Sequence, residues 1–173
     1  TELVRKHVDD RGFYFNQYVK PLYDFGNNQS NWKSGANRIT VKYSDFTTIV
    51  WKIDNENYSR FIVDGYTDSA DAVSHNFITI DGYTDILKAE TIVAIQGPLY
   101  KDEKTNLPSV LTVGVGPVYI FSEGKYIEGT WRRNDISDPF EFIDNEQQPI
   151  EVPPSKQWIH IMPLNGEVSF SDN

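Results

Sequence analysis

The sequence predicts a mainly β fold, either an antiparallel sandwich or a partly open barrel, with a short N-terminal helix or arm. Three observations favour this class. Short segments rich in β-branched and aromatic residues alternate apolar with polar side chains, which is the period of a half-buried strand. Turn-forming residues separate these segments at short intervals, as in antiparallel sheets. The strand–helix–strand alternation of a parallel sheet is not found.

Composition narrows the classes of fold and function. The 173 residues suit one domain, or one domain with an attached arm. Ten Tyr, ten Phe and four Trp argue against disorder, and the formal net charge of −9 disfavours binding to nucleic acid or to an anionic membrane surface. The lack of cysteine excludes disulfides, thiolate nucleophiles and cysteine-based zinc sites. No apolar run is long enough to predict a membrane-spanning helix.

Residues 1–37 are predicted to be an N-terminal arm or the remnant of a preceding domain. Leu3, Val4 and Val8 have helix-like spacing, which predicts one short helix within residues 1–10. A polar, breaker-rich loop then follows. Trp32 lies in this loop, so we expect its side chain to be partly exposed.

A β domain is predicted over residues 38–163. Arg38 to Tyr43 alternates apolar and polar side chains, and the turn residues 54–57 separate two further apolar segments. Thr91 to Gln96 is nearly all apolar, as expected of a strand buried on both faces. The strands predicted in this half are 38–43, 47–53, 58–63, 76–80 and 91–96.

The last third contains the most clearly marked strands. Gly124 is expected to supply a positive φ in a hairpin turn, and Gly114 and Gly116 indicate a bulge or a close backbone approach. In the last predicted strand, Trp158 and His160 share one face. The strands predicted here are 110–118, 118–121, 126–131, 140–143, 149–152 and 158–162, and residues 164–173 are assigned to a C-terminal tail.

One internal repeat is unmistakable. Asp-Gly-Tyr-Thr-Asp occurs at residues 64–68 and again at residues 81–85. The simpler interpretation is a tandem duplication that lengthened one connection. The alternative is a calcium site, because this ion prefers carboxylate and carbonyl oxygens. The calcium ligands would be Asp64, Asp68, Asp71, Asp81 and Asp85, although the EF-hand pattern is absent.

No catalytic site is predicted. The nucleophile elbow G-x-S-x-G, the zinc motif H-E-x-x-H and the glycine-rich phosphate loops are all missing. His75 follows Asp71 closely enough to suggest metal ligation, but a surface histidine is the simpler interpretation. His160 shares a strand face with Trp158 and is predicted to be a partly packed, structural histidine.

Aromatic and arginine side chains suggest a binding function instead. Such side chains anchor protein interfaces, stack on sugar rings and bind carboxylates. Trp51, Trp131 and Trp158 lie within strand patterns, which favours the core. The candidate ligand-binding residues are Tyr58, Arg60, Trp131, Arg132, Arg133 and Trp32.

Residues 111–163 contain a series of short motifs: a strand with a glycine, an aromatic residue and Phe, then a glycine turn, Trp with basic residues, Pro-x-x-Phe-x-Asp, and a final Trp-Ile. In this pattern they resemble the C-terminal domain of the YerB-like lipoproteins of Gram-positive bacteria. Residues 37–44, 51–60 and 91–96 resemble its upstream strands, so the resemblance covers residues 38–163. The matching positions of the main stretch are Gly116, Tyr119, Phe121, Gly124, Trp131, Arg132, Pro139, Phe142, Asp144, Trp158 and Ile159.

The resemblance implies an extracytoplasmic bacterial lipoprotein of unknown function, without a cofactor or catalytic residues. Membrane attachment would then be through a lipid anchor outside this chain, and the partner a protein or a cell-wall component. We therefore expect a non-catalytic binding or interaction domain. Two alternatives stay open: a cell-envelope enzyme acting on glycan or peptidoglycan, and a structural support for a missing N-terminal domain.

Overall fold

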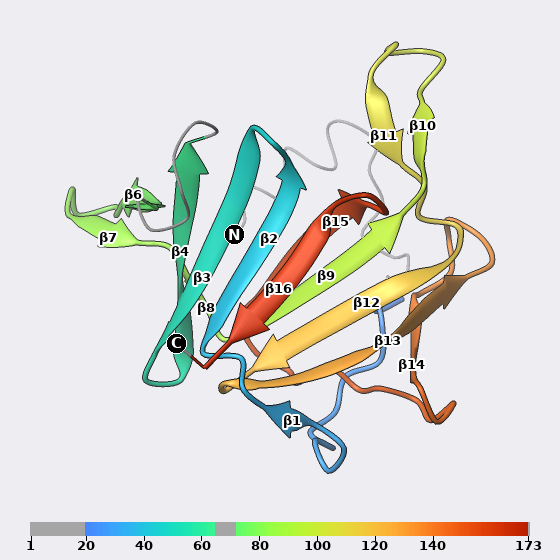
Figure 1. The fold of residues 1–173 in the computed structure, drawn as a ribbon, viewed down its shortest axis with the longest axis horizontal. Helices are drawn as coiled ribbons and strands as arrows, with labels where there is room; N and C mark the ends of the chain where they lie inside the picture. Colours follow the sequence, from blue (N-terminus) through green and yellow to red (C-terminus); the bar gives the residue numbers. More distant parts are fainter. Residues whose placement is uncertain (1–19, 65–71, 173) are drawn as a thin grey trace, which may run out of the picture.

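Two packed β-sheets form the molecule (Figure 1). This computed structural model describes residues 20–64 and 72–172, and every regular element in those ranges is a strand. The predicted mainly β, sandwich-like class is confirmed, and the sheets do not close into a barrel. The helix predicted within residues 1–10 lies outside the described residues. No helix long and apolar enough to cross a membrane occurs in the described ranges.

The first sheet has six strands in the order β1-β13-β12-β9-β15, with β14 paired to β13. Its strand pairs are antiparallel except one, because β15 runs parallel to β9. The strands are β1 (Lys33–Ser34), β9 (Thr91–Gly97), β12 (Gly114–Ser122), β13 (Lys125–Arg133), β14 (Glu141–Asp144) and β15 (Gln157–Pro163).

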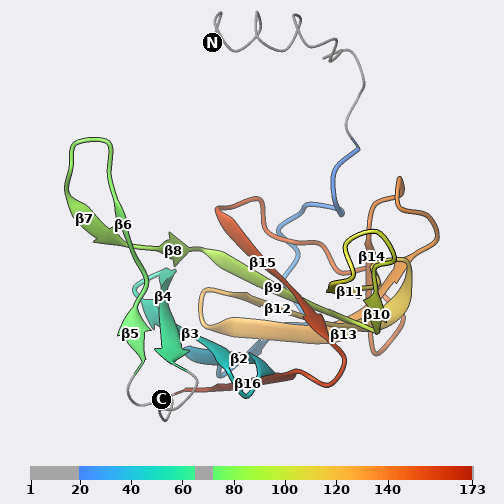
Figure 2. The same cartoon turned by 90° about the horizontal axis from the view of Figure 1, so that it is seen from above.

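The second sheet has the order β16-β2-β3-β4-β5, with β8 paired to β4. Two separate ribbons, β6–β7 and β10–β11, project from opposite ends of the molecule (Figures 1 and 2). The strands of the sheet are β2 (Arg38–Ser44), β3 (Thr47–Asp54), β4 (Asn57–Asp64), β5 (Val73–Ser74), β8 (Lys88–Ala89) and β16 (Glu167–Ser171). The ribbons are β6 (Asn76–Ile78) with β7 (Thr84–Ile86), and β10 (Leu99–Lys101) with β11 (Pro108–Val110).

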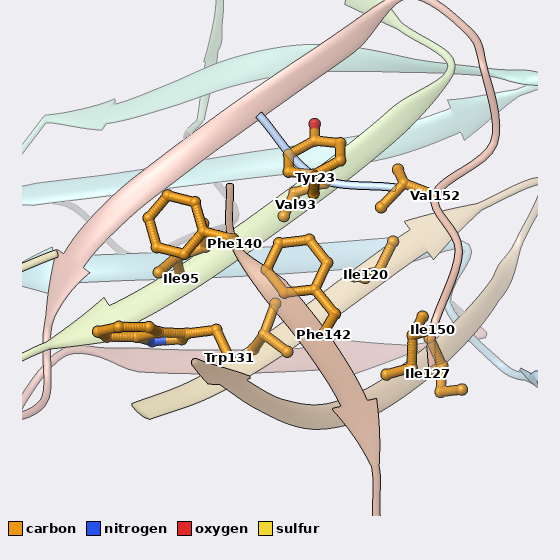
Figure 3. Packing of buried hydrophobic residues seen from close by; sticks show 11 residues of the cluster. Tyr23, Val93, Ile95, Ile120, Ile127, Trp131, Phe140, Phe142, Ile150 and Val152 are labelled. Atoms are coloured by element: carbon orange, nitrogen blue, oxygen red, sulfur yellow. The ribbon is translucent and has the colours of Figure 1, made fainter. Parts of the chain in front are cut away.

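Strand β9 separates two hydrophobic cores. All seven of its residues are buried, which confirms the prediction that this strand is covered on both faces. Val93 and Ile95 point into the first core, around Trp131 (Figure 3), whereas Ile92 and Ala94 point into the second core between the sheets.

Two glycines confirm their predicted roles. Gly124 has a φ of 73° in the turn between β12 and β13, where a side chain would be strained. A Cβ atom on Gly116 would lie 2.7 Å from Trp131 Nε1, so β12 can pass this ring only with glycine there.

Some boundaries differ from the predictions. Residues 167–171, expected in a C-terminal tail, form β16 and pair with β2. The separate predicted strands 110–118 and 118–121 are wrong, since residues 114–122 form one strand, β12. The predicted strand 149–152 is wrong too, because Pro149 and Val152 form only isolated bridges.

Candidate functional site

A polar cluster interrupts the second core. Trp51 of β3 and Arg60 of β4 are cross-strand partners, so their side chains lie on the same face of the second sheet. Trp158 and His160 of β15 alternate with Ile159 and therefore project from the facing sheet. The cluster consists of Tyr43, Trp51, Arg60, His75, Trp158 and His160, and we call it the Arg60 cluster.

The Arg60 guanidinium lies against aromatic rings, and the residue as a whole is only 9% exposed. Its central carbon is 4.7 Å from the Trp158 ring centroid and 5.9 Å from that of Trp51, within the range of cation–π attraction. Nη1 donates a hydrogen bond to His75 Nδ1. Burial lowers the pKa of Arg60 from its ordinary value.

This guanidinium has unused hydrogen-bonding capacity. Its Nε is buried and has no hydrogen-bond partner among the described residues. Within residues 20–64 and 72–172, no carboxylate forms an ion pair with Arg60. An arginine carries five N–H donors, and the Nε–H of Arg60 has no acceptor in the described part of the chain.

The backbone fixes the position of His75 beside Arg60. The Arg60 N–H donates to the Leu87 carbonyl at 2.9 Å, and the His75 N–H donates to the Arg60 carbonyl at 2.9 Å. The Leu87 N–H in turn donates to the His75 carbonyl at 2.8 Å. The segments flanking the β6–β7 ribbon are therefore bonded to each other and to β4 at this point.

His160 connects the second tryptophan with Tyr43. Trp51 Nε1 donates to His160 Nε2 at 2.8 Å, and Tyr43 Oη lies 2.6 Å from His160 Nδ1. Burial, with a smaller effect of the Arg60 charge, lowers the pKa of His160 to about 3. The imidazole is therefore neutral at physiological pH. His160 was predicted to be a partly packed histidine, and it is in fact almost completely buried.

The cluster is reachable from solvent at its rim. Tyr43, His75 and Trp158 are half-buried, in contrast to the fully buried Trp51. Tyr43 also lines a depression of about 250 Å³. The other residues of this depression are Lys42, Ser44, Asp45, Asn165 and Glu167.

Two of the predicted ligand-binding residues are fully buried. Tyr58 Oη accepts a hydrogen bond from the Gly124 N–H and donates to the Ala36 carbonyl, both at 3.0 Å. Trp131 Nε1 donates to the Gln96 carbonyl at 2.7 Å. Both side chains tie strands together. Trp51 and Trp131 are completely buried, as the strand patterns predicted.

The other predicted ligand-binding residues lie apart from the Arg60 cluster in the contacts they make. Trp32 is half-buried and packs against the first core. Arg132 is exposed, and its Nη2 donates to Gln147 Oε1 at 3.3 Å. Arg133 donates to the carbonyls of Asp138 and Ile136 and lies over the Phe140 ring, so it holds the loop that follows β13. Only Arg60 among the six belongs to the polar cluster.

The predicted calcium ligands are only partly described. Asp68 and Asp71 lie outside the described residues, and Asp64 is described only as the last residue of β4. Asp81 and Asp85 are exposed in the β6–β7 ribbon. Among the residues that the structure describes, no group of three acidic or histidine side chains could hold a metal ion.

The sequence contains a signal for one part of the Arg60 cluster. The turn at residues 54–57 fixes the register of its hairpin, which pairs Trp51 with Arg60. The approach of β15 to this pair has no such signal, because it depends on how the sheets pack.

Comparisons with known proteins identify the fold. The family described as "Protein of unknown function (DUF3048) C-terminal domain" matches residues 38–159. The chain is also similar to the crystal structure of the YerB protein from Bacillus subtilis, with a TM-score of 0.66 and 15% identity. That match covers 97% of this chain and 53% of the YerB chain, so this chain spans about half the length of that protein. No curated protein matches the chain.

Proposed function

The chain belongs to the family of DUF3048 C-terminal domains, and from the geometry of its Arg60 cluster we propose that it is a non-catalytic binding domain for an anionic group. One observation carries the proposal: Arg60 is buried with an unpartnered Nε and without an ion-paired carboxylate in the described part of the chain.

The energetics of a buried charge support binding. Removing a cation from water costs several kcal/mol unless an opposite charge or hydrogen bonds compensate. The aromatic rings and His75 offset only part of this cost. An anionic ligand would supply the missing charge and accept a hydrogen bond from the unpartnered Nε–H, and charge-assisted hydrogen bonds are stronger than neutral ones.

The state of the two histidines favours binding over acid–base catalysis. A general acid or base works best with a pKa near the operating pH, whereas the pKa of His160 is about 3. Nδ1 of His75 accepts a hydrogen bond from Arg60, which donates only. Both histidines therefore hold neighbouring side chains in position.

We also propose that the domain works outside the cytoplasm, as part of a lipoprotein that contacts a protein or a cell-wall component. The resemblance of residues 38–163 to YerB-like lipoproteins supports this location. Fractionation of cells that express the full-length protein, with metabolic labelling by a fatty acid, would test it. Recovery of an unlabelled protein in the cytosol would contradict the proposal.

Binding assays with matched variants test the main proposal. Soluble cell-wall fragments that carry carboxylates would be titrated into the wild-type domain, Arg60→Met and Arg132→Met by calorimetry. Arg132→Met removes one charge from an exposed arginine and controls for net charge. We expect Arg60→Met to lose binding and Arg132→Met to retain it. Equal affinities of the wild type and Arg60→Met would contradict the proposal.

Calcium binding by the repeat remains a separate proposal. It rests on the oxygen-rich composition of residues 64–71 and 81–85. A ligand that binds only the folded state raises the melting temperature. An unchanged melting temperature between millimolar calcium and a chelator would refute this site.

A further inference from the structure

The proton positions around His160 follow from its two neighbours. The indole of Trp51 can only donate, so His160 Nε2 must be the acceptor and carries no proton. The neutral imidazole therefore has its proton on Nδ1. Since Nδ1 is then a donor, it donates to Tyr43 Oη at 2.6 Å.

This assignment leaves the Tyr43 proton unused. The Tyr43 oxygen accepts from His160, and its O–H proton has no acceptor among the residues that the structure describes. Burial raises the pKa of Tyr43 to about 12, although the Arg60 charge lowers it slightly. The hydroxyl therefore keeps its proton at physiological pH and is available as a donor.

We propose that Tyr43 and Arg60 together bind one carboxylate of the ligand, an inference that rests on the proposed anion-binding function. Arg60 supplies the positive charge, and Tyr43, linked to it through His160 and Trp51, supplies a neutral O–H donor from the same cluster. His160 and Trp51 act as positioning residues, because their hydrogen bonds fix the direction in which the Tyr43 proton is free to point.

The charge of the site favours a carboxylate over a phosphate. The Arg60 cluster contains one permanent cation, so a monoanion balances it. A phosphate with nearly two negative charges would keep an uncompensated charge in a chain whose formal net charge is already −9. Trp158 and Trp51 lie near the guanidinium, which suits a planar group beside it. The carboxylate could be that of a peptide or of an acidic sugar.

Titration of small probes with matched variants tests the inference. N-acetylglycine, glucuronate, inorganic phosphate and neutral acetamide would be titrated into the ¹⁵N-labelled domain, with the indole N–H signals of the tryptophans as the readout. We expect shifts of the Trp51 and Trp158 signals with the carboxylates, at least tenfold weaker binding of phosphate, and none of acetamide. Whichever carboxylate binds more tightly indicates the source, peptide or sugar.

The variants separate this inference from the proposed function. Tyr43→Phe keeps the ring and removes only the hydroxyl, and Tyr126→Phe is its control at another half-buried tyrosine of the second core. We expect Tyr43→Phe to weaken carboxylate binding about tenfold, the value of one hydrogen bond to a charged group, and Tyr126→Phe to leave it unchanged. Arg60→Met should abolish it.

Three outcomes would overturn the inference. If Arg60→Met abolishes binding and Tyr43→Phe does not weaken it, Tyr43 is not a donor to the ligand, while the anion-binding function stands. Preference for phosphate over both carboxylates would refute the ligand class. If neither variant affects binding, both the inference and the proposed function fail. Unfolding curves of each variant would show that a lost affinity does not come from a lost fold.

Discussion

The tryptophans of the two cores on either side of β9 have different kinds of hydrogen-bond acceptor. In the first core the Trp131 indole donates to a backbone carbonyl of β9, and the side chains around it are apolar. In the second core the Trp51 indole donates to His160, which is hydrogen-bonded to Tyr43, and the buried Arg60 lies over the Trp51 ring. A backbone carbonyl satisfies the indole of the first core, whereas the polar side chains of the second core leave the Arg60 Nε–H without an acceptor among the described residues. This difference separates a structural tryptophan from one beside a candidate site.

The largest effect is expected from the first core. Trp131→Ala removes a completely buried ring and its hydrogen bond to Gln96, and should lower the free energy of unfolding by about 3–5 kcal/mol. Denaturant titration would measure it. Val115→Ala, at an exposed position of the adjacent strand β12, should change it by less than about 0.5 kcal/mol. Comparable losses in the two variants would mean that the first core does not depend on Trp131.

The second core should respond to pH through His160. Its pKa is about 3 in the folded state and about 6.5 when unfolded, so the unfolded chain binds more protons between these values. Neutral His160 therefore makes its full contribution to the free energy of unfolding above pH 6.5. This contribution is lost as the pH falls towards 3, and the free energy of unfolding decreases by up to about 1.4 kcal/mol per pH unit. Unfolding curves at several pH values would show this slope.

His160→Gln is the matched variant for the pH experiment. The glutamine amide can accept from the Trp51 indole but does not titrate, so the slope should become flatter between pH 6.5 and 3. Acidic side chains titrate in the lower part of this range in both the wild type and the variant. The effect of His160 is therefore the difference between the two slopes. Parallel curves would show that His160 does not titrate with the lowered pKa.

The smallest effect has the opposite sign. Arg60→Met removes a buried charge that has no ion-pair partner among the described residues, and it keeps an unbranched side chain against the tryptophan rings. It should therefore raise the free energy of unfolding by about 1–2 kcal/mol. Thermal or denaturant unfolding without ligand measures it. Stabilisation combined with lost binding is typical of a functional residue. A loss of more than about 2 kcal/mol would instead make Arg60 a structural cation.

Local patterns predicted the strands that carry the site. The turn at residues 54–57 and the β-branched segments on either side were sufficient to place β3 and β4, and the alternation in β15 put Trp158 and His160 on one face, as observed. Gly116 was correctly associated with a close backbone approach. These features depend on neighbours in sequence, so periodicity and turn chemistry reveal them.

Contacts between distant segments were not predictable in this way. The parallel pairing of β15 with β9 joins His160 to Ala94 in register, and no short pattern encodes it. The predicted ligand-binding residues include Tyr58 and Trp131, whose polar atoms are bonded to backbone groups. They also include Arg60, whose Nε has no partner in the described part of the chain. Sequence identifies an arginine in a strand, but only packing shows whether an acid reaches it.

The placement of β15 and β16 has a consequence for folding. These consecutive strands complete different sheets, since β15 pairs with β9 and β16 pairs with β2, about 65 and 130 residues earlier in the chain. The hairpins β3–β4 and β12–β13 can form locally as the chain emerges from the ribosome, but neither sheet gains its last partner until residues 157–171 are synthesised. Until then, β9 and β2 each present an unpaired edge to chaperones or to other nascent chains.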